Sequence, residues 1–279
     1  MWVASGRVHR VLITGASGLM GRILRPRLRR PGRVLRLLDI ARPEEACAGE
    51  WVEVVVGSIT EPTTMVRACA GVDAVIHLAG HSREQAWAEI MAVNVEGTRT
   101  VLEAAHAAGV SRVILASSGH VVGFRGARET LLADSAPRPD TYYGFSKAAV
   151  EALGSLYHSR FGLDVICVRV GSCFPCPRDE HALTVWLSPD DAGRLFEACL
   201  TVPRPGYRIV WGVSANTRGR CSLREGEDLG YRPVDDAERF ARELSADGST
   251  SAYFGGALYV STELGVPMPL EDGPPCFSG

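Results

Sequence analysis

The amino-acid sequence predicts an α/β fold in which helices cover both faces of a doubly wound parallel sheet. Apolar runs of strand length alternate with segments of helical spacing from residue 10 onward. Most of these runs are continuously apolar, which is typical of parallel strands that are covered on both faces. A glycine-rich turn joins the first run to the first helical segment, as this fold class requires.

The elements follow in order along the chain. Seven runs are expected as strands: Arg10–Thr14, Val34–Leu38, Val52–Val56, Ala74–His77, Arg112–Ala116, Val165–Arg169 and Arg208–Trp211. Four segments have clear helical spacing: Val93–Ala108, Tyr142–Arg160, Asp190–Thr201 and Asp235–Leu244. A further helix, from about Leu19 to Arg30, contains Pro26, which should kink or shorten it because proline lacks the backbone N–H.

We expect a single domain over residues 1–279, since the sequence contains no low-complexity linker and no internal repeat. Past residue 203 the pattern becomes irregular and rich in Gly, Pro and Ser, so residues 203–279 are expected to contribute a small cap on the substrate side. Eight cysteines are too few for a disulfide framework. The Cys173-x-x-Cys176 pair has no second ligand pair, and we interpret it as loop thiols without a metal.

Composition and charge exclude several classes of partner. The chain has 279 residues, 46% hydrophobic and 22% charged, as in ordinary soluble proteins. A formal charge of −2 argues against nucleic acid or an anionic membrane as a partner. No apolar run approaches the ~18 residues of a membrane helix, and the first apolar run is too short for a secretion signal. We therefore expect a cytoplasmic protein that acts on a small molecule.

The turn after the first strand has the composition of a dinucleotide site. Gly15, Gly18 and Gly21 follow a strand and open a helix, as in Rossmann-like folds, where glycines let the backbone approach a pyrophosphate. The spacing is G-x-x-G-x-x-G rather than G-x-G-x-x-G. Asp39 ends the next strand, where a carboxylate accepts the ribose hydroxyls and repels a 2′-phosphate. The sequence therefore favours NAD over NADP as cofactor.

A second group of residues has the pattern of a proton-transfer site. Tyr143 and Lys147 are four residues apart on an expected helix, so both side chains share one face. An ammonium group near a phenol in a dry site stabilises the phenolate and makes it a usable base. Ser118 follows the carboxyl end of the fifth expected strand, at the edge where open α/β sheets bind ligands. A pair on the helix surface is the alternative interpretation of Tyr143 and Lys147.

These motifs together resemble the extended short-chain dehydrogenase/reductase family, also called the NAD-dependent epimerase/dehydratase family. The resemblance covers nearly the whole chain and is most similar to the uronate dehydrogenase group. It rests on Thr14-Gly-x-x-Gly-x-x-Gly21, Asp39, His77-Leu-Ala-Gly80, Asn94-Val-Glu-Gly97, Ser117-Ser-Gly-His120, Tyr143-x-x-x-Lys147, Arg169-Val-Gly-Ser-Cys173 and Val210-Trp-Gly-Val-Ser-Ala-Asn216.

The resemblance implies oxidation of a hexuronate, such as glucuronate or galacturonate, at the anomeric carbon to an aldarolactone. It makes Tyr143 the base, with Lys147 tuning it and Ser118 aligning the anomeric hydroxyl. It places the other sugar contacts at Ser82, Gly119, His120, Ser172 and His181. It places the NAD contacts at Gly15, Ser17, Gly18, Leu19, Met20, Gly21, Asp39, Ile40, Ser58, Ile59, Leu78, Ala79, Gly80, Asn94, Lys147 and Cys173.

Three positions depart from the family pattern. His181 stands where an arginine clamps the sugar carboxylate, Gly119 where the family tends to have asparagine, and Ser58 where an acid touches the adenine. The resemblance therefore implies the reaction more directly than the sugar. Three other functions stay open: oxidation of another aldose or polyol, nucleotide-sugar epimerisation or dehydration, and non-catalytic dinucleotide sensing. The resemblance also implies a homo-oligomer, since related enzymes often pair through long helices of the Val93–Ala108 and Tyr142–Arg160 type.

Overall fold

The computed structural model describes residues 9–244 and 251–269. At its centre lies a seven-stranded parallel sheet in the order β3-β2-β1-β4-β5-β6-β9. Its strands are β1 (His9–Thr14), β2 (Arg33–Asp39), β3 (Val52–Val56), β4 (Ala74–His77), β5 (Arg112–Ser118), β6 (Asp164–Val170) and β9 (Tyr207–Gly212). All seven expected strands are confirmed, and the doubly wound fold class is confirmed with them.

The strand order reverses between β1 and β4, whose neighbours in the sheet continue in opposite directions. Ligands of doubly wound sheets bind at such a switch point, beyond the carboxyl ends of the strands. A buried chain of hydrogen bonds joins the two strands there. The Thr14 hydroxyl lies 2.8 Å from His77 Nδ1, and His77 Nε2 lies 3.0 Å from the Thr98 hydroxyl. Burial lowers the pKa of His77 to about 3, so its imidazole is neutral.

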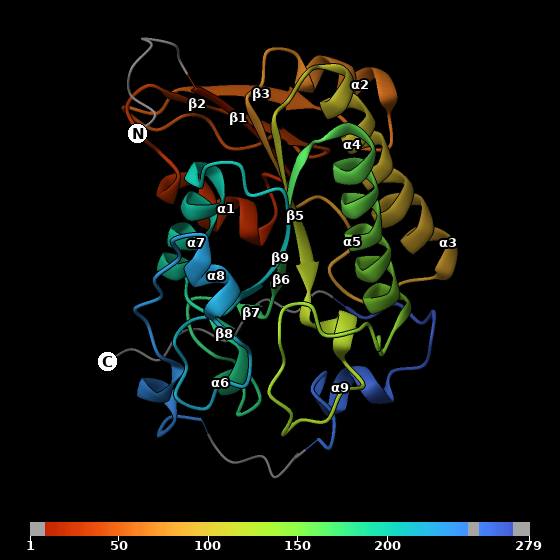
Figure 1. Ribbon diagram of the computed structural model, residues 1–279, viewed down its shortest axis with the longest axis vertical. Helices are drawn as coiled ribbons and strands as arrows, with labels where there is room; N and C mark the ends of the chain where they lie inside the picture. The colour runs from red at the N-terminus through yellow and green to blue at the C-terminus, as the bar shows by residue number, and fades with distance from the viewer. Residues whose placement is uncertain (1–8, 245–250, 270–279) are drawn as a thin grey trace.

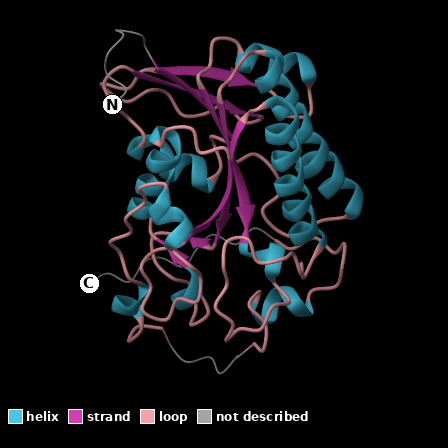
Figure 2. Ribbon diagram, viewed as in Figure 1, coloured by secondary structure: helices cyan, strands magenta, loops and turns pink. Residues whose placement is uncertain are grey.

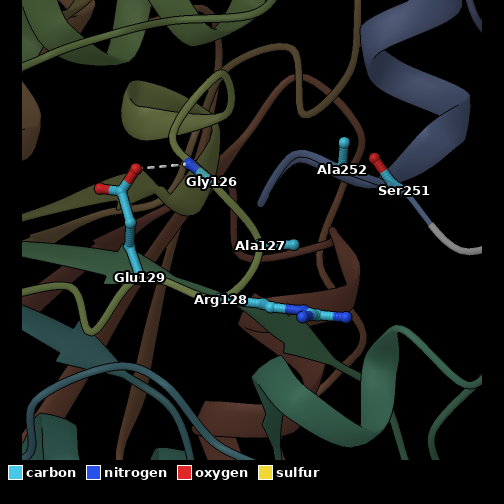
Figure 3. Close-up of a pocket in the computed structure, with 6 residues that line it drawn as sticks. All are labelled: Gly126, Ala127, Arg128, Glu129, Ser251 and Ala252. Atoms are coloured by element: carbon cyan, nitrogen blue, oxygen red, sulfur yellow. Dashed lines mark hydrogen bonds between the residues drawn. The ribbon is translucent and has the colours of Figure 1, made fainter.

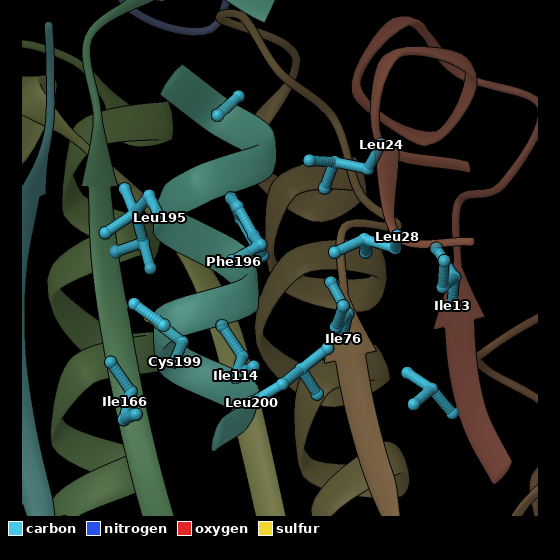
Figure 4. Packing of buried hydrophobic residues seen from close by; sticks show 14 of the residues in the cluster. Ile13, Leu24, Leu28, Ile76, Ile114, Ile166, Leu195, Phe196, Cys199 and Leu200 are labelled. Atoms are coloured by element: carbon cyan, nitrogen blue, oxygen red, sulfur yellow. The ribbon is translucent and has the colours of Figure 1, made fainter. Parts of the chain in front are cut away.

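Helices cover both faces of the sheet (Figures 1 and 2). One face carries α1 (Leu19–Arg27) and α7 (Pro189–Thr201), and the other carries α2 (Pro62–Cys69), α4 (Gly97–Ala107) and α5 (Tyr142–Phe161). Figure 4 shows side chains of α7 packing on strand residues such as Ile114 and Ile166. This two-sided burial explains why the strands are continuously apolar.

Local sequence signals set the ends of two helices. The expected helix from Leu19 ends at Arg27, three residues early, with Pro26 in its last turn. At the start of α5 the Thr141 hydroxyl accepts the Gly144 N–H at 3.0 Å, which satisfies a free donor of the first turn. At its end Gly162 adopts φ 71°, a left-handed cap that favours glycine.

Two helical expectations need adjustment. The segment expected from Val93 begins earlier, as α3 (Trp87–Glu89) and a π-helical turn η1 (Ile90–Glu96), before α4. The helix expected over Asp235–Leu244 is wrong: only a short 3-10 turn, η3 (Ala237–Phe240), forms there. The backbone N–H groups of Val234 and Asp235 donate to the Asp191 carboxylate, which holds the chain in an extended form where that helix would begin.

The remaining short elements lie beyond the carboxyl end of the main sheet. They are η2 (Gly119–Val122), β7 (Ser172–Cys173), α6 (Ala182–Val185), β8 (Trp186–Leu187), α8 (Arg224–Asp228) and α9 (Gly256–Ser261). Strand β9 belongs to the main sheet although it falls within residues 203–279, so a cap stays a prediction for the chain after Gly212. Among the described residues, no helix is long and apolar enough to cross a membrane.

Candidate active site

The glycine turn brings the chain close to a neighbouring loop at the switch point. Gly15 adopts φ 70°, and a Cβ there would lie 2.7 Å from the Ala79 backbone nitrogen. A Cβ at Gly21 would lie 2.4 Å from the Ala16 carbonyl oxygen, so glycine is needed for α1 to pack against the turn. Gly18 precedes the first turn of α1, Leu19 and Met20, without a side-chain cap. The open N–H groups of that turn suit an anionic pyrophosphate.

Asp39 is fixed above this turn at the end of β2. Its carboxylate accepts the backbone N–H of Ser17 at 2.9 Å and that of Ala41 at 3.2 Å. The next residue, Ile40, is 76% exposed, which leaves an apolar side chain free beside the carboxylate. Carboxylate oxygens have further acceptor positions, so Asp39 can also receive ribose hydroxyls.

The loops after β3 and β4 carry the other predicted cofactor contacts on this side of the site. These residues differ in how far they are buried. The Ser58 hydroxyl lies 2.8 Å from that of Thr60. The Ile59 side chain is buried in the core instead of facing the mouth of the sheet. Leu78 and Ala79 are half-buried, whereas Gly80 is exposed and adopts φ 146°.

The side-chain amide of Asn94 holds the loop after β4 through hydrogen bonds. Its Oδ1 accepts the His81 N–H at 2.7 Å, while its Nδ2 donates to the His81 carbonyl and to the Ser146 hydroxyl. Both amide hydrogens are thereby engaged. The structure gives the Asn94 side chain a positioning role, and a direct cofactor contact through it stays a prediction.

The Tyr143 and Lys147 side chains are both buried at the start of α5. The Lys147 ammonium nitrogen lies 5.7 Å from the centroid of the Tyr143 ring and donates to the Ala116 carbonyl at 2.9 Å. The two groups therefore share one face of the helix, beside the carboxyl end of β5, as their spacing predicts.

Burial dominates the protonation of this pair. Burial lowers the pKa of Lys147 to about 8. Burial also raises the pKa of Tyr143 above its ordinary value, while a hydrogen bond with Ser118 acts in the opposite direction. The phenol is therefore neutral in this form of the protein, and Lys147 has not made it acidic. A charge that would stabilise the phenolate has to arrive with a ligand.

The last residue of β5 and the turn that follows it lie beside Tyr143. The Ser118 hydroxyl accepts the His120 N–H at 3.2 Å, which caps η2. His120 lies edge-on to Tyr143 with ring centroids 5.8 Å apart. Its Nδ1 lies 2.8 Å from a carboxylate oxygen of Asp140, a buried residue. An imidazole oriented by a carboxylate in this way leaves Nε2 for a substrate oxygen.

The C-terminal arm, which we define as residues 251–269, closes over this group. The Tyr259 ring stacks on His120 with centroids 3.7 Å apart. Phe254 is buried against Gly119, where a Cβ would lie 3.0 Å from its ring. Phe254 therefore fills space beside the position at which the family tends to have asparagine. Gly255 allows the close approach, because a Cβ there would lie 2.1 Å from the Asp140 carboxylate.

Of the remaining predicted sugar contacts, His181 lies next to this arm. His181 precedes α6, and its ring lies 6.4 Å from that of Phe254. Burial lowers the pKa of His181, so a cation does not stand at the expected clamp position near neutral pH. Ser172 is half-buried in β7, and Ser82 is exposed in the loop after β4. The Arg178 guanidinium stacks on Phe174 at 3.4 Å.

Cys173 and Cys176 are both buried, and neither belongs to a disulfide. Burial raises the pKa of Cys173 to about 12, so this thiol is protonated and unreactive at neutral pH. Within the described ranges, no cluster of His, Cys, Asp or Glu is arranged to hold a metal ion.

Two hollows lie away from these residues. One is lined by Gly126–Glu129 and by Ser251 and Ala252 of the arm, and there the Glu129 carboxylate accepts the Gly126 N–H at 2.9 Å (Figure 3). The other lies at the amino end of β6, beside His106 and His158. Neither hollow contains a predicted site residue.

Sequence reasoning missed four residues of the site: Glu84, Asp140, Phe254 and Tyr259. Each comes from a loop or from the irregular C-terminal region, where no periodic pattern predicts position. The sequence does carry one signal, the Gly255-Gly256 pair, which indicates a close approach of the backbone.

The chain is similar to known proteins over most of its length. A family model described as the NAD dependent epimerase/dehydratase family matches residues 11–185. A uronate dehydrogenase of Pseudomonas syringae pv. tomato is 40% identical over 263 residues, 92% of this chain and 95% of that protein.

Two solved structures are similar throughout. Uronate dehydrogenase from Agrobacterium tumefaciens, as a mutant complexed with NAD, gives a TM-score of 0.84 at 35% identity, over 91% of this chain and 98% of that one. Glucuronic acid dehydrogenase from Chromohalobacter salexigens gives a TM-score of 0.85 at 32% identity, over 91% and 97% of the two chains.

Proposed function

Because this chain belongs to the NAD-dependent epimerase/dehydratase family, we propose that it is a dehydrogenase that oxidises a hexuronate with NAD. The substrate is the ring form of a sugar acid such as glucuronate or galacturonate, oxidised at the anomeric carbon to an aldarolactone. The observation that carries the proposal is the meeting of Tyr143, Lys147 and Ser118 at the carboxyl end of β5.

The residues at the switch point fit NAD. The glycine turn packs directly against the Ala79 backbone, where a Cβ at Gly15 would collide, and the N–H groups at the start of α1 have no side-chain cap. Asp39 suits unmodified ribose hydroxyls, because its charge repels a 2′-phosphate. The exposed Ile40 offers an apolar contact for the adenine. NAD bound at this turn supplies the acceptor for the hydride that leaves the anomeric carbon.

In this proposal the Tyr143 phenol first releases its proton to solvent, and the phenolate then takes the proton of the anomeric hydroxyl while hydride leaves the same carbon. Ser118, which hydrogen-bonds the phenol, aligns that hydroxyl. A Lys147 pKa of about 8 keeps its ammonium mostly protonated at pH 7, so it can stabilise the phenolate as it forms. Raising the pH through 8 removes this charge, which weakens the support for the phenolate.

Four residues are proposed to hold the rest of the sugar. Ser82 offers a hydroxyl from the loop after β4 and Ser172 one from β7, and His120 offers Nε2 because Asp140 occupies Nδ1. His181 faces the sugar carboxylate in this arrangement. A carboxylate close to His181 would favour its imidazolium form and so offset the effect of burial.

Replacement of Tyr143 by phenylalanine tests the assignment of the base. We expect Tyr143→Phe to abolish NADH formation from glucuronate while the dissociation constant for NAD changes by less than about twofold, since only the hydroxyl is lost. Absorbance at the NADH band follows turnover, with galacturonate, neutral aldoses and UDP-sugars as parallel substrates. A variant with near-normal turnover removes Tyr143 as the base. Reaction of the parent with UDP-sugars alone overturns the proposed substrate class.

We also propose that the protein is a homo-oligomer that pairs through α5. Phe145 and Leu156 are 40% and 55% exposed, and Ala152 lies between them on the same face. Trp87, also exposed, packs on Phe145 with ring centroids 5.4 Å apart. An apolar stripe of this kind suits a second helix, and light scattering measures the resulting mass. A cytoplasmic location, and a single domain whose cap follows β9, complete the proposal.

A further inference from the structure

Glu84 is a fully buried acid that the proposed reaction does not use. It lies in the loop between β4 and α3, two residues after Ser82, and is 0% exposed. One carboxylate oxygen accepts the backbone N–H of Tyr143 at 2.8 Å, and the other accepts the backbone N–H of Gly265 at 2.9 Å. A single side chain therefore joins the catalytic turn of α5 to the C-terminal arm.

The backbone beside Glu84 reinforces this junction. The Glu84 carbonyl accepts the Met268 N–H at 3.0 Å, and the Arg83 guanidinium donates to the Pro269 carbonyl at 2.7 Å. The far end of the arm is thus held by the same loop that carries Ser82. Its near end is held separately, where the Phe254 N–H donates to the Arg125 carbonyl.

The arm segment between these two attachments reaches the reacting group. Tyr259 lies in α9 and stacks on His120, which is itself edge-on to Tyr143. The phenol of Tyr259 is close enough to Tyr143 to contribute to raising its pKa. Figure 1 shows α9 beyond the carboxyl end of β5, at the mouth of the sheet. The arm therefore forms one wall of the proposed sugar site.

We propose that Glu84 is a positioning residue of the sugar site, which holds the C-terminal arm and its Tyr259 against His120 while it fixes the turn that carries Tyr143. The inference rests on the proposed function, since it concerns the substrate side of the same site. It assigns to Tyr259 the role of packing against the sugar beside His120.

A carboxylate is suited to this position for two reasons. Both of its oxygens are acceptors, so it satisfies two N–H donors from different segments at once. Its negative charge also lies at the N-terminus of α5, where the helix dipole favours an anion. A glutamine has the same shape but only one acceptor oxygen, so one of the two donors would face an NH2 group.

Glu84→Gln tests the proposal, with Glu89→Gln as its control. Glu89 is an exposed acid five residues further on, and its carboxylate lies 3.8 Å from His81 Nε2. In Glu84→Gln we expect amide hydrogen exchange in residues 251–269 to become about tenfold faster, and the Michaelis constant for glucuronate to rise about tenfold, as loss of one buried charge-assisted hydrogen bond implies. The NAD dissociation constant should stay within about twofold. The control should leave all three quantities unchanged.

Tyr259→Ala provides a second route, because its ring lies on the arm and its loss leaves the core intact. We expect the same rise in the Michaelis constant with unchanged NAD affinity. The double variant should be no worse than the poorer single variant, since both changes act through the arm. Additive effects, unchanged exchange in residues 251–269, or an unaltered Michaelis constant in Tyr259→Ala each overturn the proposal. Hydrogen exchange does not depend on the sugar, so failure of the parent to oxidise glucuronate refutes the proposed function alone.

Discussion

Lys147 should lower the free energy of unfolding, because its ammonium group is buried at the candidate active site. Its ammonium is buried, and burial lowers its pKa from 10.5 to about 8. A change of this size corresponds to about 3 kcal/mol of stability lost at pH 7, where the folded protein must hold a buried charge. Methionine has similar length and no charge, so Lys147→Met removes this cost. It also removes the hydrogen bond to the Ala116 carbonyl, which costs about 1 kcal/mol.

We therefore expect Lys147→Met to be inactive and yet more stable than the parent by about 2 kcal/mol at pH 7. The sign of the pH dependence follows from the lowered pKa. Between pH 8 and 10.5 the unfolded parent still binds a proton that the folded parent has released, so the parent gains stability as the pH rises. The advantage of the variant should therefore shrink over that range.

Urea unfolding of the NAD-free protein at pH 7 and pH 9.5 measures both quantities, with equal slopes as the check on two-state behaviour. Lys147→Arg is the control, because it keeps the charge and should gain nothing. A Lys147→Met variant that is less stable at pH 7, or whose advantage is the same at both pH values, refutes the argument from burial.

Two other changes have clear expected outcomes. Arg169→Met leaves Glu151 without the two 2.8 Å hydrogen bonds that Arg169 donates to it, so the free energy of unfolding should fall by about 3–5 kcal/mol. Adding Glu151→Leu should recover most of that loss, because the unpaired buried charge is then removed. Urea unfolding measures both changes, and a double variant as unstable as Arg169→Met contradicts the account. His181→Arg should lower the Michaelis constant for glucuronate but not for a neutral aldose, because the guanidinium restores a permanent charge where burial keeps the imidazole neutral. Equal Michaelis constants before and after the change place the carboxylate elsewhere.

The sheet and the cofactor side follow from local patterns, which explains why the sequence predicts them. Short continuous apolar runs bounded by turn residues favour covered strands, and a glycine turn between such a run and a helix is typical of a dinucleotide site. The juxtaposition of Tyr143 and Lys147 follows from helical spacing alone. Their protonation does not, because it depends on how much of each side chain the rest of the fold removes from water.

The substrate side could not be predicted in the same way. Glu84 and Gly265 meet across 181 residues of sequence, and no spacing rule joins them. The expected helix from Asp235 fails for a similar reason: the Asp191 carboxylate, on a distant helix, holds the entering backbone extended. Contacts of this kind depend on tertiary packing that overrides local propensity.

His77 has a consequence for the behaviour of the protein in acid. Its ring stays uncharged between Thr14 and Thr98, and burial lowers its pKa to about 3. The unfolded chain takes up this proton near pH 6.5, so each step of acidification below that value favours unfolding over the native state. Protonation of His77 would disrupt the hydrogen bond between β1 and β4, the two strands whose loops are proposed to hold NAD. Mild acid should therefore weaken NAD binding and destabilise the pairing of β1 with β4 together, in one cooperative transition.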